Sequence, residues 1–112
     1  MIHVFLDDYR ACPEGFVLAR NVEECLLLLR ECEVDILSLD FELGPDENGQ
    51  DVTSAIVREQ LYPRRIYLHT SSLWGKRVMY EQLYANKPEG TQLFNEPMPL
   101  ELLDQIAGEG EQ

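Results

Sequence analysis

Short apolar runs, rich in β-branched and aromatic residues, recur along the chain and end at polar residues. Such runs are typical of buried strands. They predict five strands, at residues 2–6, 16–19, 35–39, 65–70 and 91–94. The connection at residues 8–15 is short and is broken by Pro13, so it predicts a loop and not a crossover helix.

Longer stretches between the strands carry helix signals, which predict helices at residues 22–32, 51–60, 74–84 and 99–107. Asn21, followed three residues later by Glu24, is typical of a helix N-cap with its capping-box partner. Pro99 at the start and Gly108 after the end mark the fourth helix. Strands that alternate with helices favour a parallel sheet with right-handed crossovers, covered on both faces. The predicted fold class is therefore α/β and doubly wound.

Composition narrows the class of protein. A length of 112 residues suits one domain, which we expect at residues 1–107, followed by an acidic flexible tail at 108–112. Twenty-one acidic against nine basic side chains give a formal charge of -12, which argues against duplex DNA binding because that needs many phosphate-neutralising cations. No apolar run approaches the length of a membrane span, and the chain does not start with a basic signal segment. We therefore expect a cytoplasmic protein without membrane contact.

Polar residues collect where the predicted strands end. Asp7 and Asp8 follow the first strand, Asp40 follows the third, and Thr70 ends the fourth. In open parallel sheets, ligands bind at the carboxyl ends of the strands. If the first and third strands are neighbours, three carboxylates converge on one pocket, and an oxygen-only set of this kind suits Mg²⁺ or Mn²⁺. The alternative interpretation is that each acid only starts a turn or caps a helix.

Two further groups of side chains are open to two interpretations each. Ser71, Ser72 and Lys76 surround a predicted helix start, where free backbone N–H groups and the helix dipole favour an anion. A capped helix with a solvated first turn explains them equally well. His69 precedes Thr70, so strand alternation sends their side chains to opposite faces unless the strand bends. A lone strand histidine is more often a packed residue than a catalytic base.

Three segments, LDDYRACPEGF, SLDFELG and HTSSLWGKRVM, resemble the signatures of the cyclic-phosphate processing receiver domains. This divergent branch of the bacterial response-regulator receiver superfamily lacks the first receiver helix. The resemblance spans essentially the whole chain and implies a mostly parallel, flavodoxin-like sheet of five strands in the order 2-1-3-4-5, with a loop in place of that helix. It also implies that Asp40 is the phosphoacceptor and nucleophile, that Asp7 and Asp8 are the metal-binding acidic pair, and that Thr70 supplies the hydroxyl group.

The sequence departs from the family pattern at positions that bear on chemistry. Phe41 and Glu42 follow the phosphoacceptor, where this branch usually has His and then Asp, and Phe41 cannot transfer a proton. Glu96 stands where ordinary receivers carry a lysine that pairs with the phosphoryl group. Glu96 reverses that charge and would oppose an aspartyl phosphate unless Arg10, Lys76 or a metal ion compensates.

Three functions stay open on the sequence alone. The first is a receiver-like signalling module of the phosphorelay kind, in which Mg²⁺ or Mn²⁺ assists phosphoryl transfer from a donor to Asp40. The second is metal-dependent processing of cyclic phosphates, in nucleotides or at RNA ends, with Arg10 or His69 aiding the phosphate. The third is a degenerate receiver that only binds a protein partner. No output domain follows Gly108, so any signal is expected to pass to a partner in trans.

Overall fold

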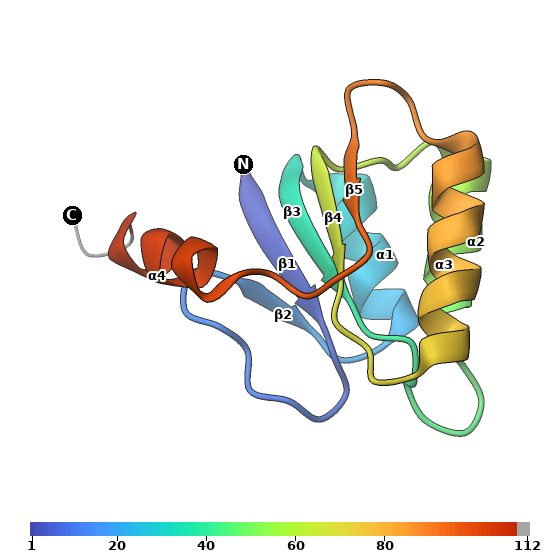
Figure 1. The fold of residues 1–112 in the computed structure, drawn as a ribbon, viewed down its shortest axis with the longest axis horizontal. Coiled ribbons are helices and arrows are strands. Elements are labelled where there is room, and N and C mark those ends of the chain that lie inside the picture. Colours follow the sequence, from blue (N-terminus) through green and yellow to red (C-terminus); the bar gives the residue numbers. More distant parts are fainter. Residues whose placement is uncertain (110–112) are drawn as a thin grey trace.

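The structure, a computed structural model, describes residues 1–109. Five parallel strands form one sheet of order β2-β1-β3-β4-β5 (Figure 1). The strands are β1 (Ile2–Leu6), β2 (Val17–Ala19), β3 (Val34–Leu39), β4 (Arg65–Leu68) and β5 (Gln92–Phe94). This arrangement confirms the fold class and the strand order that the sequence and its resemblance predicted.

Within these residues four helices complete the fold: α1 (Val22–Glu31), α2 (Gly49–Glu59), α3 (Leu73–Asn86) and α4 (Leu100–Glu109). Helices α1, α2 and α3 cover one face of the sheet, and α4 lies on the other (Figure 1). Side chains of each strand alternate between the two faces. On β3, Leu37 and Leu39 pack toward the three helices, whereas Ile36 packs toward α4.

The second face of the sheet is covered by α4 together with the connection between β1 and β2. In the described chain this connection, residues 7–16, contains no helix, as predicted. Phe16 of the connection and Ile106 of α4 join a small core with Phe5 and Tyr67. Gly15 has a φ of 89°, and a Cβ placed there would lie 2.7 Å from Cγ2 of Ile106. The loop and α4 therefore approach each other as closely as a glycine allows.

The carboxyl end of the chain differs from its predicted form. Helix α4 continues through Gly108 to Glu109, because Gly108 does not adopt the left-handed conformation of a helix cap. The first two residues of the predicted tail thus belong to α4. Residues 110–112 lie outside the described part of the chain, and a flexible tail stays a prediction. No helix within residues 1–109 is long and apolar enough to cross a membrane, and the cytoplasmic location stays a prediction.

Candidate functional site

Three neighbouring strands end at the same edge of the sheet and bring three side chains together. In the register, Leu6 of β1 lies opposite Leu39 of β3, which lies opposite Leu68 of β4. The next residue on each strand is therefore Asp7, Asp40 or His69. Backbone hydrogen bonds continue the ladder there: Asp40 N donates to Leu6 O at 3.1 Å, and His69 N donates to Leu39 O at 3.0 Å. The sheet itself thus sets the spacing of the site.

The Asp7 carboxylate organises the turn that follows β1. Its side chain is 1% exposed, and its Oδ1 accepts hydrogen bonds from the backbone N–H groups of Tyr9 and Arg10, both at 2.8 Å. Burial alone would raise the pKa of Asp7. The hydrogen bonds from Arg10, Tyr9 and His69 outweigh burial and lower the pKa to about 2. Asp7 is therefore an anion at neutral pH, held in one orientation.

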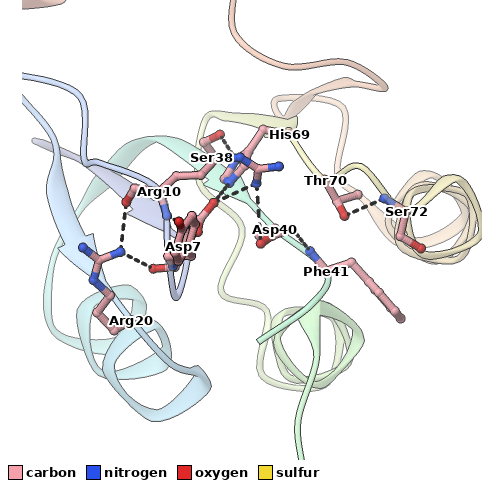
Figure 2. A network of polar contacts seen from close by, with 10 residues as sticks. Asp7, Arg10, Arg20, Ser38, Asp40, Phe41, His69, Thr70 and Ser72 are labelled. Atoms are coloured by element: carbon pink, nitrogen blue, oxygen red, sulfur yellow. Dashed lines mark hydrogen bonds and ion pairs between the residues drawn. The ribbon is translucent and has the colours of Figure 1, made fainter. Parts of the chain in front are cut away.

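The Arg10 guanidinium lies between the two buried carboxylates (Figure 2). Its Nη1 is 2.9 Å from Asp7 Oδ2 and 3.6 Å from Asp40 Oδ2. The hydrogen bond to Asp7 raises the pKa of Arg10, so its charge is fixed. The Asp40 side chain is 8% exposed, and its Oδ1 accepts from the backbone N–H of Phe41 at 2.7 Å. Asp40 Oδ2 is the less committed of its two oxygens.

His69 links the site to the sheet face that carries α4. Its Nε2 lies 2.9 Å from Asp7 Oδ2, its Nδ1 lies 2.6 Å from Ser38 Oγ, and its ring stacks on Phe5. Burial lowers the pKa of His69, against the opposing effect of the bond to Asp7, so the ring is neutral at neutral pH. Because ionised Asp7 can only accept, Nε2–H donates to Asp7 and the Ser38 hydroxyl donates to Nδ1.

Asp7, Arg10 and Asp40 border a cavity of about 740 Å³ at the carboxyl ends of the strands. Carboxylates dominate the lining, with Asp8, Glu42, Asp46 and Glu47 in addition to Asp7 and Asp40. Arg10 is the basic residue of the lining. Arg10 also borders a smaller cavity of about 280 Å³ on the side of Pro97, Met98 and Leu103. The guanidinium therefore has open space on two sides of its present position.

Of the predicted metal-binding residues, Asp7 and Asp40 come together and Asp8 stands apart. Ligand atoms of Asp7, Asp40 and His69 lie within 4.8 Å of one another, a group that does not include Asp8. Asp8 is exposed and lines the same cavity. It can therefore reach a bound ion only through water or after a rotation of its side chain.

The predicted phosphate-binding residues around α3 are partly engaged with one another. Thr70 Oγ1 accepts from Ser72 N at 3.1 Å, and Ser72 Oγ caps α3 by accepting from Gly75 N at 3.0 Å. Ser71 lines the larger cavity, whereas Ser72, Thr70 and Lys76 are not part of its lining. The structure thus favours a capped helix at Ser72, with the Thr70 hydroxyl hydrogen still free to donate.

Sequence reasoning missed two residues that shape the site. Arg20 Nη1 donates to the backbone oxygens of Asp7 and Arg10, at 3.0 and 2.9 Å, and so fastens the turn between them. Ser38 orients His69 from within β3. A serine inside the apolar run of β3 was a visible signal. Arg20 carried none, because its contacts depend on how the loop folds back.

Comparison with protein families agrees with this arrangement. Residues 2–85 match the model of the family described as Cyclic-phosphate processing Receiver domain, which confirms the resemblance drawn from the sequence. No curated protein matches the chain.

Proposed function

Because the chain belongs to the cyclic-phosphate processing receiver domain family, we propose that its acidic site handles a phosphoryl group at Asp40 with the help of a divalent cation. The observation that best supports this is the grouping of Asp7 and Asp40, two buried carboxylates whose ligand atoms lie within 4.8 Å. Two such acids and one arginine at the edge of a cavity suit a phosphorylated ligand and its counter-ion.

The donor set fits a hard cation. Asp7 and Asp40 offer carboxylate oxygens, and Asp8 lines the same cavity. His69 directs a protonated nitrogen at Asp7, so the atoms open to an ion are oxygens, which favours Mg²⁺ or Mn²⁺ over zinc. When bound, such an ion neutralises negative charge on phosphoryl oxygens.

In the proposed reaction, Asp40 Oδ2 attacks the phosphorus of a small phosphodonor. A new P–O bond forms on Asp40, and the bond to the leaving group breaks with its electron pair going to the leaving group. Glu96 is exposed near the end of β5 and is negatively charged, so it cannot pair with a phosphoryl group. Arg10 supplies the positive charge at the site instead. The Thr70 hydroxyl, which still has its hydrogen to donate, is available for a phosphoryl oxygen.

The test is incubation with acetyl phosphate and Mg²⁺, followed by intact mass measurement. We expect the mass of one phosphoryl group to be added to the native protein and not to Asp40→Asn. Asp46→Asn is the matched control, because Asp46 is an exposed acid of the same cavity. An unmodified mass over a range of donor and Mg²⁺ concentrations would contradict phosphoacceptance.

A signalling role extends the same proposal. The phosphorylated domain would act on a protein partner in trans, in a relay whose donor is a small phosphorylated compound or another protein. If calorimetry detects no binding of Mg²⁺ or Mn²⁺, the chemistry proposed for Asp40 fails, and a receiver that acts only by binding a partner becomes the better account.

Cyclic-phosphate processing is a second candidate, favoured by the Ser38–His69–Asp7 chain of hydrogen bonds. A neutral histidine beside an arginine and two carboxylates is a suitable group for moving a proton at a phosphate ester. We expect His69→Gln to lower the hydrolysis of 2′,3′-cyclic nucleotides by about 100-fold or more. Persistence of these nucleotides with native protein and Mn²⁺ would remove this candidate, and leave the mass test on Asp40 unaffected.

A further inference from the structure

The place between Asp7 and Asp40 already holds a positive group of the protein. Arg10 Nη1 contacts Oδ2 of both acids, whereas their Oδ1 atoms are satisfied by backbone N–H groups. Among residues 1–109, no other arginine or lysine side chain forms an ion pair with either acid. The guanidinium is therefore what offsets the repulsion between two nearly buried carboxylates.

The Arg10 guanidinium is held between the two acids only by its contacts with their carboxylates. Its backbone is fixed in the turn, by Asp7 Oδ1 on one side and by the Arg20 guanidinium on the other. The Arg10 side chain is 44% exposed and borders both cavities, so it can rotate out of the site without moving the turn. The carboxylates, with side chains 1% and 8% exposed, stay in place.

From this geometry we propose that Arg10 is an internal counter-cation, which a divalent metal ion displaces from Asp7 and Asp40, and that the displaced guanidinium binds the substrate's phosphate. The inference rests on the proposed function, since it requires both ligands to use this site. A guanidinium paired with two carboxylates competes with the metal ion for the same oxygens. Once released, it is a fork of donors suited to phosphate oxygens.

The exchange couples the two ligands. A metal ion that frees Arg10 makes phosphate bind better, and phosphate that engages Arg10 keeps it from returning to the carboxylates. By thermodynamic linkage, phosphate must then strengthen metal binding by the same factor as the metal strengthens phosphate binding. Removal of the guanidinium abolishes the competition and the part of the coupling that passes through Arg10.

The test measures Mn²⁺ binding by electron paramagnetic resonance of the free ion, with and without inorganic phosphate. Arg10→Met is compared with the native protein and with Arg58→Met, which removes the same charge from an exposed position at the far end of α2. We expect Arg10→Met to bind Mn²⁺ roughly tenfold more tightly than the native protein or Arg58→Met does. Phosphate should tighten Mn²⁺ binding to the native protein and to Arg58→Met by a larger factor than to Arg10→Met, where only the direct attraction between the ion and phosphate is left.

The outcomes separate the two proposals. If the native protein binds Mn²⁺ and Arg10→Met binds it equally or more weakly, the exchange is overturned while the proposed function stands. If none of the proteins binds Mn²⁺, both are overturned. Circular dichroism establishes that each variant is folded, and Arg10→Lys provides a second folded variant. Its compact ammonium lacks the planar fork, so we expect Mn²⁺ affinity between those of the native protein and Arg10→Met.

Discussion

Arg20 fastens the turn that carries Asp7 and Arg10 without touching either side chain. Its two hydrogen bonds to backbone oxygens come from a charged donor, and the one to Asp7 is partly buried whereas the one to Arg10 is exposed. We expect Arg20→Ala to lower the free energy of unfolding by about 1–2 kcal/mol and to speed amide hydrogen exchange at Tyr9 and Arg10. Arg77→Ala is the control, since its exposed pairing with Glu81 should contribute less than about 0.5 kcal/mol. Equal losses in urea denaturation would contradict a special role for Arg20.

The three cysteines differ in burial, and their reactivity should follow. Cys25 is fully buried in α1, which raises the pKa of its thiol to about 12. At pH 8 its thiolate fraction is then roughly one in ten thousand. Cys12 is half-buried, with a pKa raised by burial, and Cys32 is exposed. Iodoacetamide followed by peptide mass analysis should modify Cys32 first, Cys12 more slowly, and Cys25 only in denaturant. Labelling of native Cys25 as fast as Cys32 would contradict this packing.

For individual residues, the sequence predicted which side chains lie at the site better than it predicted their hydrogen-bond partners. Asp7 and Asp40 were identifiable because an acid that ends a buried strand lies at the edge of the sheet. The role of His69 could not be identified, because a lone strand histidine fits both a packed residue and a catalytic base. In the structure the ring packs on Phe5 and its Nε2 donates to Asp7, which agrees with the packed interpretation, and a catalytic role of His69 stays a prediction. Hydrogen-bond directions of this kind depend on how three separate segments meet.

Helix α2 ends at a residue with an unfavourable backbone conformation. Gln60 is its C-cap and has a φ of 58° and a ψ of 49°, in the left-handed region. We expect Gln60→Gly to raise the free energy of unfolding by about 0.5–1 kcal/mol, because glycine lacks the steric penalty there. Lys87→Gly at the C-cap of α3 is the matched control. Its φ is -67°, so glycine should destabilise by about 0.5–1 kcal/mol. Shifts of the same sign in thermal unfolding would refute the argument.

Element boundaries show where local signals suffice. The Asn21 cap of α1 was predicted and is present, with Asn21 Oδ1 accepting from Glu24 N, whereas the side chain of its predicted capping-box partner Glu24 accepts from Arg20 N instead. The end of α4 was misplaced because a glycine marks a helix end only when its φ is positive, and Gly108 does not meet that condition. Likewise β4 ends at Leu68, two residues before the predicted end. The Asn21 cap depends on a side-chain bond that the sequence indicated, whereas the end of α4 depends on a backbone angle that the sequence does not show.

At the scale of the molecule, alternating strands and helices were enough to predict a parallel sheet, and the missing first helix followed from the short connection before β2. How the missing helix changes the covering of the sheet face that carries α4 could not be predicted. With one helix where a doubly wound sheet usually has more, the loop at residues 7–16 has to complete that face, and it packs on α4 from the other end of the chain. A contact between such distant segments leaves no periodic pattern in the sequence.

Gly15 of the loop and Ile106 of α4 approach each other closely, and a double-mutant cycle can measure how strongly they are coupled. Gly15→Ala adds strain at a φ of 89° and brings Cβ within 2.7 Å of Ile106 Cγ2, so we expect a loss of about 2–4 kcal/mol in the free energy of unfolding. Ile106→Ala should cost about 2–5 kcal/mol by leaving a cavity. In the Ile106→Ala background the clash with Cγ2 is gone, while the strain and the 3.3 Å approach to the backbone oxygen of residue 106 persist, so Gly15→Ala should cost about 1–2 kcal/mol less there. Gly44→Ala is the control: its φ is 107°, but a Cβ there meets nothing within 4 Å, so its cost should be the same in both backgrounds. Additive losses for Gly15→Ala and Ile106→Ala would contradict a direct contact between the loop and α4 at this point.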